Sequence, residues 1–346
     1  MKKIILFAVI LYMTIPGRLW SQVLYVDAVK GSDEAPGTLS APLASLEKAA
    51  DLADGFTRQA PVIIKIAPGL YKLTRTVKIT SPAGRQAPEA YTLEAMVMPG
   101  DTNWRPNVMP VIQSVSANNT YKDFDHCAGI EVFRNKVCIR GLKFVGNANP
   151  GADYYYPIER DSAGLQDLEI SQCYFIGDKN SAPIQGALYT QGAGIHVDHC
   201  IFFGCKHDLL LFEGIRSFSL THSILYGSYG AAVWFGTQKD PDQPFTFNDN
   251  IIAACNYFWA LATTSAHPLC RFTNSLIAGN EHYLAVRVNG NLTPFDGDDG
   301  HAESGILRSG KVSLNEVTIK GMPHDFLSLA PGSAGTDIDA GIFKRQ

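Results

Sequence analysis

The chain has 346 residues, with 29 Lys and Arg against 33 Asp and Glu, so its formal net charge is −4. A nucleic-acid-binding domain carries a basic excess, and this balance speaks against such a partner. With 46% hydrophobic and 18% charged residues the chain is not disordered, and it is long enough to bury a sizeable core.

The first 22 residues have the layout of a secretory signal peptide. Lys2 and Lys3 precede an apolar run from Ile4 to Ile15. This run is short for a spanning helix, which needs roughly 20 residues. We therefore expect residues 1–22 to be removed and the protein to be secreted or periplasmic. No later segment is apolar enough to span a membrane.

A short helix is predicted over residues 45–53, after an apolar strand that begins at Leu24. The helix places Leu46, Ala49, Ala50 and Ala53 on one face. Such a face can cover the open end of a stacked structure, where unpaired strand edges would otherwise invite aggregation.

An internal repeat dominates the chain from residue 137 onward. Each copy reads apolar-x-apolar-x-polar-small, followed by a second apolar stretch and usually by Gly. The first six copies start 23 to 31 residues apart, and the seventh starts 42 residues after the sixth. The seven segments are Val137–Gly146, Leu168–Gly177, Ile195–Gly204, Phe218–Gly227, Phe245–Ala254, Cys270–Gly279 and Val312–Gly321.

The repeat predicts an all-β fold, a right-handed parallel β-helix. The alternation of apolar and polar residues indicates a strand, and the polar-small step that follows it indicates a bend. The second apolar stretch forms another strand. A third apolar stretch, such as 231–234, completes a rung of three short strands. A propeller blade would need roughly 40 residues, so the spacing disfavours a propeller. We expect one domain of seven to nine rungs over residues 23–346. Within it, residues 23–80 form the N-terminal strand, cap helix and first rungs, 128–320 the regular rungs, and 321–346 a closing segment.

Equivalent residues at the bend should stack into a ladder of mostly small or polar side chains. The positions are Leu142, Cys173, Cys200, Ser223, Asn250, Ser275 and Val317. Free cysteine is often a buried small residue, which is the preferred interpretation of Cys173 and Cys200. A disulfide between them is the alternative, although stacked side chains rarely match disulfide geometry.

Three flanking segments carry a family resemblance: residues 24–50, residues 62–71 with a Pro-Gly-x-Tyr turn, and residues 331–341. They resemble the opening and closing pieces of secreted proteins of the pectate-lyase-like superfamily, which includes bacterial polysaccharide lyases, glycoside hydrolases and pectin esterases. The resemblance implies a parallel β-helix and a polysaccharide substrate or ligand. It implies no particular reaction, because fold does not determine chemistry.

In that superfamily the substrate lies along a groove beside the first strand of the rungs. The segments expected to line it are 130–134, 154–161, 182–190, 206–213, 231–236, 257–261 and 283–287. The candidate catalytic residues are Lys206, His207, Asp208, Glu159 and Arg160. The candidate substrate-binding residues are Tyr155, Phe212, Glu213, Trp234, Trp259 and Arg287. Each aromatic residue has packing in the core as its alternative, because a shift of one residue reverses the facing of a strand.

Two kinds of enzyme fit these residues. A lyase must neutralise a uronate carboxylate and supply a base, for which Lys206, His207, Arg160 and Arg287 are candidates. A hydrolase needs two carboxylates about 5–9.5 Å apart, and the acids available are Glu131, Glu159, Asp161, Asp208 and Glu213. We expect an exported polysaccharide-degrading enzyme, with a lyase favoured over a hydrolase. A non-catalytic glycan-binding or cell-surface module is the alternative.

Two places contain metal-ligating residue types. Asp296, Asp298 and Asp299, with Glu303, offer oxygen ligands suited to Ca²⁺, but their spacing departs from the calcium-loop pattern and favours a solvated acidic loop. The segment His196-Val-Asp-His199 places His196 and Asp198 outward, where a solvated face is preferred to a metal site. Ca²⁺ is the only cofactor that these residues suggest. We expect the protein to be a monomer.

Overall fold

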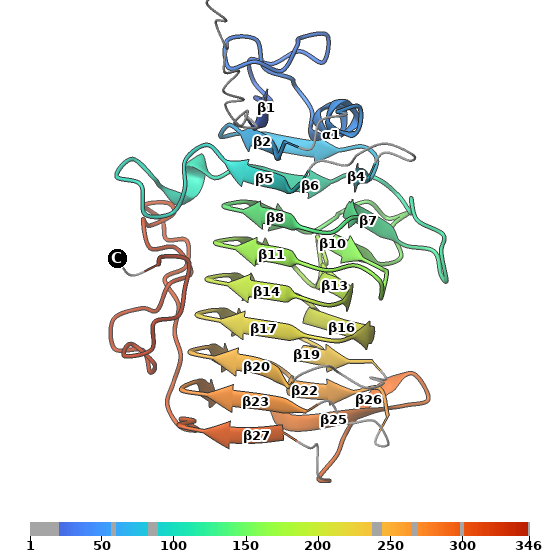
Figure 1. Cartoon of the computed structure of the whole chain (residues 1–346). Helices are drawn as coiled ribbons and strands as arrows, with labels where there is room; N and C mark the ends of the chain where they lie inside the picture. Colours follow the sequence, from blue (N-terminus) through green and yellow to red (C-terminus); the bar gives the residue numbers. More distant parts are fainter. Residues whose placement is uncertain are drawn as a thin grey trace, which may run out of the picture.

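The computed structural model describes residues 21–56, 60–81, 89–236, 244–263, 269–297 and 301–344. Almost all of the predicted signal peptide lies outside these ranges, and its removal stays a prediction. In Figure 1 the strands stack one above another along a single axis, from β1 at one end to β27 at the other.

Within the described residues the strands form three sheets, of ten, nine and eight strands. The ten-stranded sheet contains β1 (Gln22–Val26), β2 (Val62–Ile66), β5 (Tyr91–Ala95), β8 (Val137–Arg140), β11 (Leu168–Ser171), β14 (Ile195–Asp198), β17 (Phe218–Thr221), β20 (Phe245–Asn248), β23 (Cys270–Thr273) and β27 (His301–Ser304). The nine-stranded sheet contains β4 (Val77–Ile79), β7 (Cys127–Val132), β10 (Tyr155–Arg160), β13 (Gly186–Gly192), β16 (His207–Ile215), β19 (Ala231–Phe235), β22 (Tyr257–Leu261), β25 (His282–Val288) and β26 (Asn291–Pro294). The eight-stranded sheet contains β3 (Leu70–Leu73), β6 (Val111–Ser114), β9 (Lys143–Val145), β12 (Tyr174–Ile176), β15 (Ile201–Phe203), β18 (Ile224–Tyr226), β21 (Ile251–Ala253) and β24 (Leu276–Ala278).

Apolar alternation explains why these strands stack in register. On the ten-stranded sheet the second apolar residue of one repeat lies beside the second apolar residue of the next repeat. Ile170 lies beside Val197, and Val197 lies beside Leu220. All three side chains are fully buried in one continuous core. A single turn cannot bury such a face alone, whereas stacked turns share it. The right-handed parallel β-helix predicted from the repeat is confirmed, with about eight turns.

The bend between the ten-stranded and eight-stranded sheets uses one left-handed residue in each repeat. Gly141 has a φ of 73°, and the equivalent residues Gln172, His199, His222 and Asp249 have φ between 50° and 57°. Apart from Gly, mainly Asn, Asp and His tolerate this region well, which explains the polar residue at this position of the repeat. The bend therefore stacks polar side chains of successive turns directly beside one another.

The next residue in each bend points inward and forms the predicted ladder. Cys173, Cys200, Ser223, Asn250 and Ser275 are fully buried. The backbone N–H of Cys200 donates to Ser223 Oγ at 3.1 Å, and that of Ser223 donates to Asn250 Oδ1 at 2.9 Å. All seven cysteines are free thiols, so the alternative of a Cys173–Cys200 disulfide is wrong.

Helix α1 (Leu46–Asp54) lies at the N-terminal end of the stack (Figure 1). Ser45 caps it by accepting a hydrogen bond from the N–H of Lys48 at 3.2 Å. The four residues predicted to share its apolar face, Leu46, Ala49, Ala50 and Ala53, are each about 1% exposed or less. One further short helical turn, η1 (Pro106–Val108), lies in the connection between β5 and β6.

The seventh aligned segment, 312–321, is not a rung, and that prediction is wrong. Its place beside β23 is taken by β27, which lies within the 42-residue spacing. Val317 is 60% exposed, whereas Val312 and Leu314 pack against the outside of the eight-stranded sheet. The apolar alternation of this segment therefore serves to cover that sheet, and the chain then runs back along the stack toward the N-terminal side (Figure 1).

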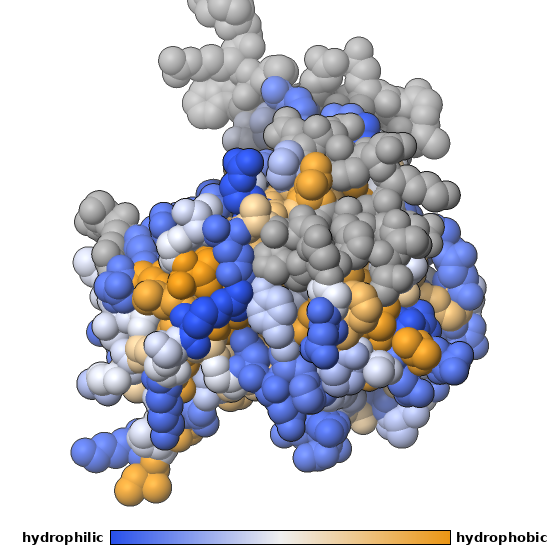
Figure 2. Space-filling model, turned by 90° about the horizontal axis from the view of Figure 1, so that it is seen from below, coloured by the Kyte–Doolittle hydropathy of each residue, from blue (hydrophilic) through white to orange (hydrophobic). Residues whose placement is uncertain are grey.

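Figure 2 views the molecule from the end that carries β25 and β27. Apolar residues are visible there as separate patches among polar ones. The exposed apolar residues of the last turn are Leu269, Tyr283, Val288 and Leu307. None of the helices in the described ranges is long and apolar enough to cross a membrane.

Candidate functional site

The seven segments expected to line a groove coincide with β7, β10, β13, β16, β19, β22 and β25 of the nine-stranded sheet. Strand register decides which side chains face outward. One row of partners packs in the interior: Val77, Ile130, Ile158, Leu188, Leu209, Val233, Trp259 and Leu284. The row that follows it along each strand faces outward: Lys78, Glu131, Glu159, Tyr189, Leu210, Trp234, Ala260 and Ala285.

Two carboxyl groups are direct neighbours in this outer row. Glu131 on β7 pairs in register with Glu159 on β10, and the two residues are 6% and 3% exposed. Burial raises the pKa of Glu131 above its usual range, and the charge of Glu159 adds to this, against the opposing effect of Lys78. The Lys78 ammonium lies 3.5 Å from Glu131 Oε2. Burial therefore stabilises the protonated form of Glu131 relative to that of an exposed carboxyl group.

His126 holds the second carboxyl group in place. Its Nε2 lies 2.8 Å from Glu159 Oε2, and its Nδ1 lies 2.9 Å from the carbonyl oxygen of Phe124. Because a carbonyl oxygen can only accept, Nδ1 carries a proton, and an ionised Glu159 requires a second proton on Nε2. Burial opposes this charge, but the hydrogen bond and charge of Glu159 outweigh it and raise the pKa of His126. Glu159 and His126 thus form a buried hydrogen-bonded pair in which the carboxyl group favours the charged form of the imidazole.

Aromatic side chains continue the outer face from the acids toward the following turns. Tyr156 lies 5.3 Å from the His126 ring and 5.1 Å from Tyr189, measured between centroids. Phe212 stacks between Tyr189 at 5.1 Å and Trp234 at 5.6 Å. We call His126, Glu131, Glu159, Tyr156, Tyr189, Phe212 and Trp234 the acid–aromatic cluster. Such a surface combines polar groups that can fix a ligand with flat apolar rings that can pack against it.

A third carboxyl group borders the cluster. Asp161, directly after β10, accepts hydrogen bonds from Lys122 and from the amide of Gln191. Lys122 lies on the loop that also carries Phe124 and His126, so this loop is bound to the outer face by two charged contacts. The connection between β6 and β7 therefore builds one wall of the site.

Comparison with solved structures identifies the architecture. A pectin methylesterase mutant in complex with a hexasaccharide matches with a TM-score of 0.53 at 12% identity, over 93% of this chain and 98% of that chain. A rhamnogalacturonan lyase (TM-score 0.44, 12% identity, 93% of this chain and 100% of that chain) and pectate lyase Pel9A (0.44, 12%, 95% and 97%) also match. No protein-family model matches the chain, and no curated protein matches it in sequence.

The fold is that of the pectate-lyase-like parallel β-helix. At these levels of identity the likeness concerns the fold alone, and the site must be judged from its own residues. The resemblance stated from the flanking segments is confirmed in this sense.

Four of the predicted site residues face the interior of this β-helix, so their prediction as groove residues is wrong. Tyr155 and Trp259 pack in the central core at 2% and 0% exposure. Arg160 is fully buried and donates to the carbonyl oxygens of Gln191 and Ala193, and burial lowers its pKa to about 10. Asp208 is fully buried, accepts from Ser228 at 2.5 Å, and has a pKa raised by burial. For Arg160 and Trp259 the physical reason is register, because each is one residue away from the outward row, beside Glu159 and Ala260 respectively.

Lys206 and His207 lie at the turn that enters β16. His207 is 7% exposed, and its Nδ1 accepts a hydrogen bond from the N–H of Ala231 at 3.1 Å. Burial lowers its pKa to about 3, so at neutral pH it is uncharged and a weak base. Lys206 is half-buried, and burial lowers its pKa. The outward row that contains Glu159 passes through β16 at Leu210, four residues after Lys206. Neither Lys206 nor His207 belongs to that row.

The remaining residues predicted to bind substrate lie in different parts of the nine-stranded sheet. Phe212 and Trp234 pack on the outer face in the acid–aromatic cluster, and their role in substrate binding stays a prediction. Arg287 is exposed on β25, five strands away from β10. The side chain of Glu213 lies outside what the structure describes.

The structure describes only part of the acidic loop for which Ca²⁺ binding was predicted. Asp296 is exposed beside a hollow of about 230 Å³ lined by His282, Tyr283 and Phe295. Glu303 instead binds Arg308 and the hydroxyl of Tyr283. Asp298 and Asp299 lie outside the described residues, so the Ca²⁺ prediction stays untested.

Sequence reasoning missed His126. It precedes β7 in a connection that belongs to no repeat, so periodicity gives no hint of it. Only the return of that loop onto β10 brings His126 beside Glu159.

Proposed function

We propose that the protein is a glycoside hydrolase that acts at Glu131 and Glu159. The observation that carries this proposal is that two acids on neighbouring strands, paired in register on the outer face, have different environments. Burial raises the pKa of Glu131, while Glu159 is hydrogen-bonded to His126 at 2.8 Å. Pairs of titratable groups in such contrasting environments are how enzymes obtain an acid and a base at one pH.

The position of the two acids on neighbouring strands supports a retaining mechanism. Neighbouring strands lie about 4.8 Å apart, and retaining glycosidases hold their carboxyl groups about 5–5.5 Å apart. Glu159 attacks the anomeric carbon while Glu131 gives its proton to the departing glycosidic oxygen. Glu131 then takes a proton from water as that water attacks the same carbon, which releases the sugar and the Glu159 carboxylate.

Lyase chemistry, favoured by sequence alone, has less support from this face. A lyase must neutralise the carboxylate of a uronate. Of the two lysines described beside the acids, Lys122 is paired with Asp161, and the Lys78 ammonium lies 3.5 Å from Glu131 Oε2. Glu131 and Glu159 in the cluster, with Asp161 at its border, also disfavour an anionic sugar ring, so we propose a neutral glycan as substrate.

The test is a panel of neutral and uronate-containing polysaccharides, read for both reducing ends and the ultraviolet absorbance of unsaturated products. We expect reducing ends without unsaturated product. Glu131→Gln and Glu159→Gln should each lower turnover by about 10²–10⁴-fold, the contribution of a positioned acid or base. The matched control is Glu169→Gln, an exposed acid on the ten-stranded sheet, which should keep full activity.

A second substrate separates the two roles. An aryl glycoside with a good leaving group needs no proton from an acid, so it should restore much of the activity of Glu131→Gln but not that of Glu159→Gln. Unsaturated product would instead indicate a lyase. Binding without turnover, lost in Trp234→Ala, would indicate the glycan-binding module.

A further inference from the structure

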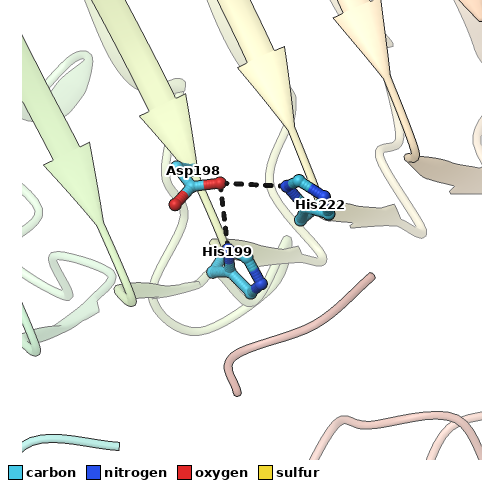
Figure 3. Close-up of side chains that lie close together, drawn as sticks. All are labelled: Asp198, His199 and His222. Atoms are coloured by element: carbon cyan, nitrogen blue, oxygen red, sulfur yellow. Dashed lines mark hydrogen bonds and ion pairs between the residues drawn. The ribbon is translucent and has the colours of Figure 1, made fainter. Parts of the chain in front are cut away.

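A group of metal-ligating side chains lies far from the acid–aromatic cluster, on the bend between the ten-stranded and eight-stranded sheets. Asp198 ends β14, His199 follows it, and His222 occupies the same place in the next turn, after β17. Figure 3 shows the three side chains converging beside a stretch of the chain's C-terminal segment. In the described ranges this is the one set of three or more His, Cys, Asp or Glu residues whose ligand atoms lie close enough to share an ion.

The stacking of the bend explains the juxtaposition. His199 and His222 both have left-handed backbone, with φ of 50° and 51°, and equivalent bends of neighbouring turns lie one strand spacing apart. Their rings stack with centroids 4.6 Å apart. Two His in successive repeats at this position must therefore meet.

The distances suit a small cation. Asp198 Oδ1 lies 2.9 Å from His199 Nδ1 and 3.2 Å from His222 Nδ1, and the ligand atoms of all three lie within 4.8 Å of one another. A tetrahedral Zn²⁺ with bonds of about 2.0–2.2 Å separates its ligand atoms by roughly 3.3–3.6 Å. The two rings are almost parallel, so both must tilt about χ2 to aim at one ion, and this torsion is soft.

His199 provides a second, independent observation. It is 5% exposed, yet neither of its ring nitrogens makes a well-directed hydrogen bond, and Nδ1 instead makes an ion-pair contact with Asp198 Oδ1 at 2.9 Å. A buried imidazole without a hydrogen bond costs free energy, and a metal bond would offset this cost.

The surroundings already accommodate positive charge. The Lys344 ammonium lies 2.9 Å from Asp198 Oδ2, so the structure itself places a cation against this carboxylate. On the other side of His222, Asp249 Oδ2 lies 3.9 Å from Nε2, beyond hydrogen-bonding distance, and adds a second negative charge beside the site.

We propose that Asp198, His199 and His222 bind a divalent transition-metal ion of the Zn²⁺ class, with Lys344 as an internal competitor for the carboxylate. Two imidazoles and one carboxylate suit Zn²⁺, whereas Ca²⁺ and Mg²⁺ prefer oxygen ligands throughout. The site holds two turns of the solenoid together and requires no carbohydrate, so it is independent of the proposed hydrolase.

The experiment uses the tag-free full chain, stripped with chelator and titrated with ZnCl₂ by calorimetry. We expect one equivalent to bind to the wild type and the melting temperature to rise with zinc concentration, as binding to the folded state requires. His222→Asn, which keeps a residue suited to the left-handed backbone, should weaken binding more than 100-fold and abolish the thermal shift. Lys344→Ala should strengthen binding several-fold, because it removes the competing cation.

The matched control is His196→Ala. His196 is an exposed histidine of the same strand, bonded to Ser219, and its replacement should leave zinc binding unchanged. The seven cysteines are present in every variant, so zinc bound by thiols would be common to all of them. The proposal is overturned if the wild type binds no zinc, or if His222→Asn binds it as tightly as His196→Ala. Binding of Ca²⁺ at the same affinity as Zn²⁺ would also overturn it.

Discussion

Asn250 shows what a single residue does inside the solenoid. Its Oδ1 accepts from the N–H of Ser223 at 2.9 Å, and its Nδ2 donates to the carbonyl oxygen of Leu220 at 2.9 Å. Its own N–H donates to Ser275 Oγ at 3.0 Å. At 0% exposure no water can replace these partners, so the side chain satisfies the backbone of the neighbouring turn.

We therefore expect Asn250→Ala to lower the free energy of unfolding by about 2–4 kcal/mol. The change leaves a donor and an acceptor of the backbone buried without partners and opens a small cavity. Urea denaturation followed by far-ultraviolet circular dichroism measures it. Asn180→Ala, at an exposed loop position, should stay within about 0.5 kcal/mol of the wild type. Equal stability of the two variants would contradict the role of the ladder.

At the scale of elements, β9 shows how the eight-stranded sheet is covered. Lys143 of β9 is 5% exposed, and its ammonium donates to the carbonyl oxygen of Pro106 at 2.6 Å. The rings of Tyr174 and Phe326 lie 5.8 and 5.9 Å from it. Since no acid pairs with this lysine in the described residues, burial lowers its pKa to about 8.

Replacing Lys143 by Met should therefore stabilise the protein at pH 7, by about 1–3 kcal/mol after loss of the Pro106 hydrogen bond. The pKa is lower in the folded state than the usual 10.5, so the unfolded chain binds more protons between pH 8 and 10.5. The penalty for ionised Lys143 thus shrinks as pH rises through this window. Denaturation of wild type and Lys143→Met at pH 7 and pH 10 should show a smaller difference at pH 10.

Lys72→Met is the control for this prediction. Lys72 lies exposed on β3 of the same sheet. Its replacement should give the same small difference from the wild type at both pH values. A pH-independent effect of Lys143→Met would mean that the ammonium is not desolvated.

At the scale of the whole molecule, one continuous core runs through the stack and contains most of the thiols. Six of the seven cysteines are buried, and Cys138 is half-buried. The turns are therefore held by shared burial and strand hydrogen bonds, with no covalent cross-link between them.

This organisation predicts how the thiols react. In the native protein we expect at most Cys138 to react readily with a thiol reagent, and slowly even so, because burial raises its pKa to about 12. After denaturation without reductant all seven should react. Mass spectrometry of the alkylated protein counts them, and three protected pairs after denaturation would contradict the free-thiol ladder.

Much of this molecule followed from local patterns in the sequence. Alternation of apolar residues, with a polar residue such as His199 before a small one such as Cys200, determined six of the turns, the bends and the ladder. The spacing of Leu46, Ala49, Ala50 and Ala53 determined the buried face of α1. These features depend on neighbours one to four residues apart, and stacking then repeats the same local solution in each turn.

Only the tertiary structure decided which residues form a site. A one-residue offset places Glu159 outward and Arg160 inward, and the sequence contains no signal fine enough to distinguish them. The segment 312–321 has the pattern of a rung but covers the eight-stranded sheet, because apolar alternation suits any face that becomes buried. His126 reaches Glu159, and Lys344 reaches Asp198, through loop and tail returns across 33 and 146 residues. Such contacts depend on the path of the whole chain, which no local pattern encodes.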